Sequence, residues 1–426
     1  MIQKYKRSFS TVAFAAFSVC LMTAGFTSCV KKVDVEQVPQ QTGIIQAAPL
    51  EGPKNTILSI SGVNIPATGV VVKVNGVVAP IVSSTARGLQ VKVMPGTGTG
   101  PIEVTFGGAT YSAGTFVYYF TEYNVTSLTN GQVGYLDGPA ATARYEEIIG
   151  LAIHNNVLYN AQYSVPRVRK LDLGTLMVST LAGDGTVGNV DAQGTAAKLG
   201  EHDFISIDAT GNVFVADQTN NKIRKITPGG LVSTFVSTTF PIQAIKVGKL
   251  GSIFVAGTSN IAKYSSTGTL VWRVTSKSPT YRAGDTSNLG FSLYGGMEVD
   301  PTETKIYVLN TVTNSATAAT RVAVLDITAN TFDVIPGGAS GLQFGSDIVR
   351  DASGGFYVAE YYLNRISYIK NGKRLTVIGG TAGDVNGNQT VARIRGPHGL
   401  AMDAQGNLYV GEASANNKIK KVTPVE

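Results

Sequence analysis

Histidine is the side chain that most readily acts as a general base or a nitrogen ligand near neutral pH, and this chain has three of them. They are His154, His202 and His398. His154 follows a predicted strand, whereas His202 and His398 each stand just before one. The three are therefore expected at different ends of the strands, and a structural role is favoured for His398. We predict no metal site, no catalytic residue and no cofactor.

Carboxylates recur at two positions of a repeated strand pattern. Those in the turn that leaves the first strand of a repeat are Asp208, Asp300, Asp351 and Asp403. We expect these side chains to accept hydrogen bonds from turn amides. Those that end the next strand are Asp217, Glu360 and Glu412. This second set either lines a polar mouth for a ligand or bonds to neighbouring loop amides, and we favour the loop amides.

Aromatic residues follow strand ends at the same face. They are Tyr163, Tyr361 and Tyr362, and the long segment SKSPTYRAGDTSNLGFSLYGG adds Tyr281, Arg282, Phe291 and Tyr294. Exposed aromatic rings stack on the apolar faces of sugars, while Arg, Asp and Asn side chains bond to hydroxyls. Together with the second carboxylate set, they form a candidate site for a neutral or weakly acidic glycan. An equal alternative for Phe291 and Tyr294 is packing between repeats, and Trp272 is expected to pack in an outer strand.

Two glycine-rich stretches look like ligand motifs but lack the context. Residues 183–188, GDGTVG, spell the G-x-G-x-x-G of dinucleotide-binding proteins, yet no helix is predicted after them. Residues 384–388, DVNGN, begin like a calcium loop, but Gln389 stands where glycine is needed and Arg395 where glutamate is needed. Both are interpreted as loops between repeats.

The candidates belong to a repeat of four short strands. Its clearest copy is DFISIDATGNVFVADQTNNKIRKITPGGLVSTFVST, from about residue 203 to 238, with turn residues between the strands. Five further copies begin near residues 150, 242, 295, 345 and 398. One copy cannot bury both faces of its sheet, so the copies must stack on one another. The last copy stops after its third strand, and residues 124–128 are predicted to supply the fourth and close a ring.

The repeat resembles a known family. An apolar strand, D-x-x-G-N, a second strand ending in VAD and N-x-x-I-x-K are similar to the NHL repeat, which forms six-bladed β-propellers. The resemblance implies a six-bladed propeller over residues 122–426. Peptide-amidating and streptogramin lyases resemble this architecture and place histidines on one face of the ring, a pattern that the histidines here do not match.

The first residues predict export. Three basic residues precede an apolar run that ends near Phe26, and Thr27-Ser28-Cys29 follow. The segment resembles a bacterial lipoprotein signal, which implies a signal peptide over 1–28, a lipid on Cys29 and a tether over 29–43. A plain secretory signal cut elsewhere is the alternative. Without the three signal cations the net charge falls from +7 to 7 − 3 = +4 and is spread thinly, so nucleic acid is not an expected partner.

Residues 44–121 predict a second all-β domain. The stretches NTILSISGVNI and GPIEVTFGGATYSAGTFVYYF alternate apolar and polar residues, with Gly and Pro at turns, as a β-sandwich does. The segments ISG at 60–62, VNG at 74–76 and VMPG at 93–96 resemble an IPT/TIG domain, an immunoglobulin-like spacer or interaction module. We interpret it as a rigid stalk, with glycan or protein contact as the alternative.

The predicted fold class is therefore all-β, an immunoglobulin-like sandwich followed by a six-bladed NHL-type propeller. This architecture resembles the surface lipoproteins of Bacteroidetes glycan-uptake systems. The resemblance implies a non-catalytic lipoprotein, anchored in the outer membrane at the cell surface, that binds polysaccharide or oligosaccharide for an outer-membrane transporter. A protein-interaction scaffold is the alternative, and a propeller lyase or lactonase comes third.

Overall fold

The computed structural model describes residues 45–425 except 63–64, 86–87, 276–292, 312–318, 330, 337, 339–341 and 414–415. Within that part the regular elements are strands and one 3-10 turn, η1 (Gly194–Ala196), so the all-β prediction is confirmed. No helix of the described residues is long and apolar enough to cross a membrane. The predicted signal, Cys29 and the whole tether lie outside the described residues.

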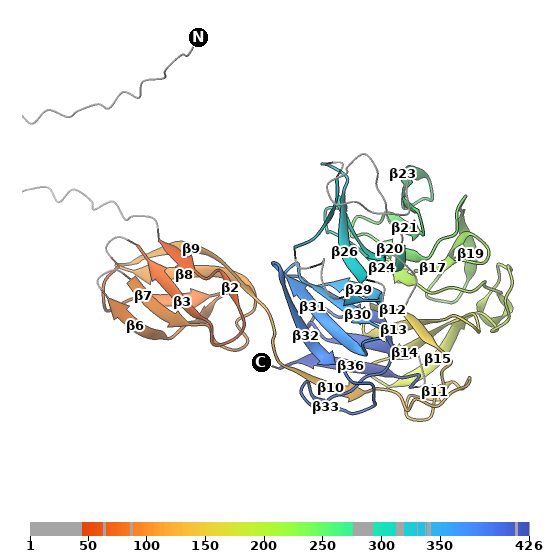
Figure 1. The fold of residues 1–426 in the computed structure, drawn as a ribbon, viewed down its shortest axis with the longest axis horizontal. Helices are drawn as coiled ribbons and strands as arrows, with labels where there is room; N and C mark the ends of the chain where they lie inside the picture. The colour runs from red at the N-terminus through yellow and green to blue at the C-terminus, as the bar shows by residue number, and fades with distance from the viewer. Residues whose placement is uncertain are drawn as a thin grey trace, which may run out of the picture. The chain divides into compact units, whose positions relative to one another are not determined.

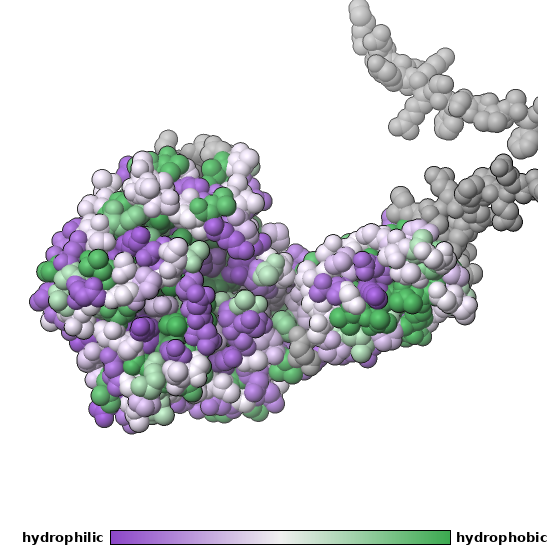
Figure 2. Space-filling model, turned by 180° about the vertical axis from the view of Figure 1, so that it is seen from behind, coloured by the Kyte–Doolittle hydropathy of each residue, from purple (hydrophilic) through white to green (hydrophobic). Residues whose placement is uncertain are grey.

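Two sheets form the sandwich, with strand orders β1-β3-β7-β6 and β2-β9-β8-β4-β5. The strands are β1 (Gln46–Ala48), β2 (Glu51–Gly52), β3 (Ile57–Ser61), β4 (Val71–Val74), β5 (Val77–Val78), β6 (Ile81–Thr85), β7 (Gly88–Lys92), β8 (Gly100–Phe106) and β9 (Ala109–Tyr118). In β3 every second side chain is buried, Leu58 and Ile60 among them, as expected of a strand with one face on a core. Figure 2 shows hydrophobic surface gathered on this part of the chain.

From Tyr123 onward, the described residues form six sheets, which we call ring sheets 1 to 6 (Figure 1). Ring sheet 1 contains β12 (Ile148–His154), β13 (Val157–Gln162), β14 (Arg167–Asp172), β15 (Met177–Ala182) and β11 (Gly138–Pro139). Ring sheet 2 contains β16 (Ile205–Ile207), β17 (Val213–Asp217), β18 (Lys222–Ile226) and β19 (Val232–Ser237). Ring sheet 3 contains β20 (Ala244–Val247), β21 (Ile253–Gly257), β22 (Asn260–Tyr264) and β23 (Leu270–Thr275).

The remaining ring sheets follow the same antiparallel order. Ring sheet 4 contains β24 (Leu293–Val299), β25 (Lys305–Thr311), β26 (Ala319–Asp326), β27 (Thr331–Val334) and β28 (Leu342–Gln343). Ring sheet 5 contains β29 (Gly345–Arg350), β30 (Phe356–Glu360), β31 (Arg365–Lys370) and β32 (Lys373–Gly379). Ring sheet 6 contains β34 (Pro397–Met402), β35 (Leu408–Glu412), β36 (Ile419–Pro424), β10 (Tyr123–Ser127) and β33 (Gly387–Asn388).

The first strands of the ring sheets surround a common axis. Each of β12, β16, β20, β24, β29 and β34 contacts the next in this order, and β34 contacts β12. A closed circle of such inner strands, with the outer strands radiating away, is the arrangement of a β-propeller. Apolar side chains fill the spaces between neighbouring ring sheets, such as Phe214 of β17 and Phe254 of β21 in one cluster.

Ring sheet 6 joins segments from the two ends of the propeller chain. Its outer strand β10 pairs with β36, with Val125 opposite Val422, and Figure 1 shows orange β10 beside blue β36. The prediction that residues 124–128 supply the missing strand is confirmed by this pairing. Closure in this way removes the sheet edges that an open ring would expose.

Aspartates shape the turns that leave the inner strands. Asp208 Oδ1 accepts hydrogen bonds from the backbone N–H groups of Thr210 and Asn212, both at 2.9 Å. Asp403 Oδ1 does the same for Gln405 and Asn407, at 3.0 and 2.8 Å. These hydrogen bonds confirm the turn role predicted for this set.

Loss of packing in the closing strand should weaken the whole ring. Val125 is fully buried among residues of ring sheets 5 and 6, so Val125→Ala should lower the free energy of unfolding by about 2 kcal/mol in urea denaturation. Thr126→Ala, on the exposed face of the same strand, is the matched control and should change it by less than about 0.5 kcal/mol. Equal effects of the two substitutions would contradict the closure.

Candidate functional site

Two pockets lie at opposite ends of the inner strands. One has a volume of about 660 Å³ and receives residues from the beginnings of inner strands, such as Ile149 and His398. The other has a volume of about 490 Å³ and receives residues from their ends, such as Ile153 and Met402. We call the first the aromatic pocket, defined by Tyr163, Asp203, Phe344, Tyr361, Tyr362 and His398.

Three aromatic rings in the pocket contact one another. The ring centroids of Phe344 and Tyr362 are 5.0 Å apart, and those of Tyr361 and Tyr362 are 5.1 Å apart with the ring planes nearly perpendicular. Tyr361 also lies edge-on to His398 at 6.1 Å. Tyr362 keeps 46% of its surface exposed, so one ring of the cluster is available for stacking.

Phe344 has an unusual backbone conformation. Its φ is +44°, a left-handed value that a bulky residue rarely adopts. The carbonyl of Phe344 accepts a hydrogen bond from Tyr361 N at 3.2 Å, which ties the residue to the end of β30. Strained positions of this kind occur often at ligand sites, where the surrounding structure holds them.

Acidic residues complete the lining of the aromatic pocket. Glu146, Glu147 and Asp203 line it, and Tyr163 shares a side-chain hydrogen bond with nearby Glu201. Burial, together with the charges of Glu201 and Glu147, raises the pKa of Asp203 to about 7. The carboxyl of Asp203 is thus partly protonated near neutral pH.

The histidines do not converge. Burial lowers the pKa of His398 to about 4, so its imidazole is neutral at pH 7, and its Nδ1 lies 3.3 Å from the carbonyl of Ile149. His202 is fully buried, with Nδ1 2.8 Å from the carbonyl of Gly200. The described residues include no group of three or more His, Cys, Asp or Glu side chains arranged to hold a metal ion.

The predicted carboxylate set Asp217, Glu360 and Glu412 does not line a mouth, because all three side chains are fully buried. Glu360 forms an ion pair with Arg365 at 2.7 Å and accepts a hydrogen bond from Gln343 N at 3.0 Å. Glu412 accepts a hydrogen bond from Arg395 N at 2.8 Å. This result removes the three carboxylates from the candidate glycan site. Their oxygens bond to groups inside the protein, in agreement with the interpretation favoured from the sequence.

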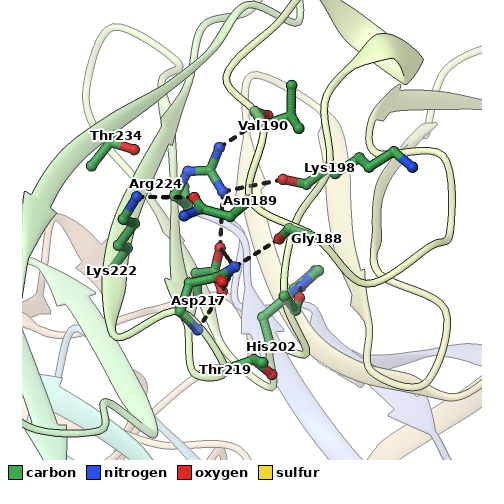
Figure 3. Close-up of polar contacts among 12 residues, drawn as sticks. Gly188, Asn189, Val190, Lys198, His202, Asp217, Thr219, Lys222, Arg224 and Thr234 are labelled. Atoms are coloured by element: carbon green, nitrogen blue, oxygen red, sulfur yellow. Dashed lines mark hydrogen bonds and ion pairs between the residues drawn. The ribbon is translucent and has the colours of Figure 1, made fainter.

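Asp217 belongs to the best defined of these networks (Figure 3). Its Oδ2 lies 2.9 Å from Nη1 of Arg224, and both side chains have no exposed surface. Arg224 also donates to the carbonyls of Val190 and Lys198, each at 3.2 Å, and pairs with Asp191. Through its contacts with Asp191, Val190 and Lys198, Arg224 therefore fixes the loop before ring sheet 2 to that sheet.

The structure brings together some of the predicted aromatic residues. Tyr163, Tyr361 and Tyr362 meet in the aromatic pocket. Tyr281, Arg282 and Phe291 lie outside the described residues, and of Tyr294 the structure gives only its backbone, in β24. Trp272 packs on Phe254 with centroids 6.2 Å apart, as expected of an outer-strand residue.

Several pocket residues escaped prediction, namely Glu146, Glu147, Asp203, Phe344 and Asn417. One signal could have found Asp203. Asp203 stands five residues before the turn aspartate Asp208, as His398 stands five residues before Asp403, and Ile149 occupies the same position in the first repeat. Asp203, His398 and Ile149 all line the pocket. Phe344 has no such signal, because it follows the irregular segment between ring sheets 4 and 5.

The fold and the pocket define a β-propeller protein with a ligand-sized site at one end of its axis. No family model matches the chain, and no curated protein matches it. A solved structure of a protein of unknown function from Bacteroides thetaiotaomicron is 16% identical, with a TM-score of 0.58 and coverage of 90% of this chain and 98% of that chain.

Two further solved structures are similar over the same extent. An auxiliary nutrient binding protein from Bacteroides thetaiotaomicron is 16% identical with a TM-score of 0.53, covering 91% of this chain and 99% of that chain. An auxiliary nutrient binding protein from Bacteroides ovatus is also 16% identical, with a TM-score of 0.52 and the same coverages. At this identity the likeness shows a shared fold and nothing more.

Removal of the buried cation should be costly. Arg224→Met leaves the carboxylate of Asp217 buried without its ion pair, so the free energy of unfolding should fall by about 3–5 kcal/mol. Lys222→Met is the matched control. The ammonium group of Lys222 bonds to Asn189 at the protein surface, and its loss should cost less than about 1 kcal/mol in the same urea titration. If Arg224→Met lowers the free energy of unfolding as little as Lys222→Met does, Arg224 does not hold the loop to ring sheet 2.

The raised pKa of Asp203 predicts a pH-dependent stability. A carboxyl whose folded pKa of about 7 exceeds its unfolded value stabilises the fold at low pH, and that contribution is lost as the pH rises through 7. Because asparagine does not titrate, the melting temperature of Asp203→Asn minus that of the wild type should increase between pH 5 and pH 8.

Asp172→Asn is the control for this titration. Hydrogen bonds from the amides of Thr175 and Gly174 lower the pKa of Asp172, so its carboxyl stays ionised throughout this range. The difference between this variant and the wild type should be constant from pH 5 to pH 8. A constant difference for Asp203→Asn as well would show that Asp203 does not titrate near 7.

Proposed function

We propose that this chain binds glycan at the aromatic pocket without chemically changing it. The observation that carries the proposal is the cluster of Phe344, Tyr361 and Tyr362, with exposed ring surface beside carboxylates in a pocket of about 660 Å³. Sugar rings offer apolar C–H faces to aromatic rings and hydroxyl groups to hydrogen-bond acceptors. A pocket of this size holds a few sugar units.

The names of two similar structures support a binding role. Both are called auxiliary nutrient binding proteins, and we carry nutrient capture over to this chain as part of the proposal. The nutrient is proposed to be a polysaccharide or oligosaccharide, passed to a transporter in the outer membrane.

The finer assignment of the chain is also a proposal. We assign residues 122–426 to a six-bladed NHL-type propeller and residues 44–121 to an IPT/TIG-like spacer. Repeats with the pattern of residues 203–238 and the six ring sheets support the first assignment, and the two packed sheets support the second. The basic and apolar segment before Cys29 supports a lipid anchor at the outer membrane. Growth with a radioactive fatty acid should label the protein, and the Cys29→Ser variant should lose the label.

One observation favours a second candidate, a lyase or lactonase activity. Asp203 has a pKa of about 7 in a pocket, and carboxyls tuned in this way often act as general acids or bases. We rank it below binding because no partner nucleophile, metal group or charged imidazole accompanies Asp203 among the described lining residues. Release of new reducing ends or unsaturated products from a bound glycan would reverse the ranking.

Affinity gels with soluble plant, fungal and host polysaccharides test the proposal. At least one polymer should retard the purified protein, and Tyr361→Ala combined with Tyr362→Ala should weaken that binding on the order of tenfold or more. Tyr111→Ala removes a ring that stacks on Phe106 in the sandwich, so it is the control and should bind as the wild type does. Absence of retardation by every polymer would refute glycan binding.

A further inference from the structure

The described lining of the aromatic pocket carries negative charge without a compensating cation. Glu146, Glu147 and Asp203 line it, and neither Lys nor Arg is among its described lining residues. His398 adds no positive charge at pH 7, because burial lowers its pKa to about 4. The chain as a whole has a formal net charge of +7, so the local charge of the pocket is opposite to that of the protein.

The pocket also offers hydrogen-bond acceptors that lack donors. Asn417 is 6% exposed, and its Oδ1 has no hydrogen-bond partner among the residues that the structure describes. Buried polar atoms are nearly always satisfied, and Asn417 is one of the residues that line the pocket. An ionised carboxylate accepts hydrogen bonds and donates none. Glu147 already accepts one from the hydroxyl of Ser164 at 2.7 Å, and the carboxylates of Glu146 and Glu147 can accept further ones from a ligand.

Aromatic rings beside carboxylates suit a positively charged group. The faces of Tyr and Phe rings attract ammonium ions, and a carboxylate bonds an ammonium group strongly because both partners are charged. Neutral hydroxyls gain less from such a lining, and an anionic sugar would meet repulsion from every acidic side chain.

We infer that the aromatic pocket selects its glycan by charge, taking sugars that carry a free amino group and rejecting uronic acid or sulfated sugars. This inference rests on the proposed function and names the substrate class of the same site. It departs from the expectation from sequence of a neutral or weakly acidic glycan, because the described lining is acidic and lacks cations.

The test compares oligosaccharides that differ only in charge. Glucosamine hexamers with free amines, the same hexamers fully N-acetylated, and galacturonic acid hexamers are titrated into the purified protein by calorimetry at low salt and pH 6. The amine form should bind on the order of tenfold more tightly than the acetylated form, and the uronate should not bind. Added salt should narrow the difference, because screening weakens charge contacts.

Charge-removing variants locate the effect. In Glu146→Gln combined with Glu147→Gln, the amine and acetylated hexamers should bind within about twofold of each other, because two of the carboxylates that line the pocket are gone. Glu103→Gln removes a carboxylate of β8 in the sandwich and should leave the tenfold preference intact. Melting curves confirm that each variant is folded.

The outcomes distinguish failure of charge selection from failure of glycan binding. If the amine and acetylated hexamers bind equally to the wild type, or if the uronate binds best, charge selection is wrong while glycan binding stands. If the preference survives in the double variant, the acidic lining is not its source and the inference also fails. If no hexamer binds and no polymer retards the protein, both the inference and the proposed function are refuted.

Discussion

The buried guanidinium of Arg169 fixes the segment that carries two acids of the aromatic pocket. Its side chain has no exposed surface, pairs with Asp137 at 2.7 Å and donates to the carbonyl of Leu136 at 2.7 Å. It also donates to the carbonyl of Arg144, and its guanidinium carbon lies 4.4 Å from the centre of the Tyr145 ring. A buried cation cannot lose such partners without a large cost, so the loop is held in one arrangement up to Tyr145. Glu146 and Glu147 follow at once.

The same device recurs at other ring sheets. Arg224 holds the loop before ring sheet 2, and the buried ammonium group of Lys420 bonds to Asp384 at 2.7 Å in the loop before β34. Each of these loops repeats one parallel and one antiparallel bridge, as in the pairs Val187 with Leu199 and Val190 with Lys198. In these three loops one buried cation therefore holds the loop to the neighbouring sheet.

Closure of the ring decides whether the aromatic pocket exists. Glu147 precedes β12, Tyr361 follows β30 and His398 lies in β34, so residues separated widely in sequence must meet. They meet because inner strands β12 and β34 are neighbours, with His398 Nδ1 3.3 Å from the carbonyl of Ile149. The pairing of β10 with β36 completes ring sheet 6 beside them, which links the stability of the closing strand to the shape of the site.

Local sequence patterns made the fold predictable, but they did not predict several residues of the aromatic pocket. The turn aspartates and the strand periods are local signals, and the missing last strand is a signal that compares the two ends of the propeller. The observed contacts agree with them, for example that of Asp208 with Asn212. The burial of Asp217 was also readable, because strand alternation puts it on the same face as Val213 and Val215, which pack in a core. By contrast, the contact between Phe344 and Tyr362 depends on an irregular turn with positive φ, for which the sequence carries no period.

The two ends of the inner strands show how one scaffold separates stability from recognition. At the far end Lys246 pairs with Glu298, and Lys249 and Arg350 also line the smaller pocket, so its carboxylates have cations beside them. Between the ends, the buried carboxyl of Asp347 accepts hydrogen bonds from Ile348 N and Leu400 N, both at 2.8 Å, and ties inner strands β29 and β34 together. The acids of the aromatic pocket have no such cation among its described lining residues. A fold gains no stability from uncompensated carboxylates, and the ligand proposed above would supply the positive charge that the described lining lacks.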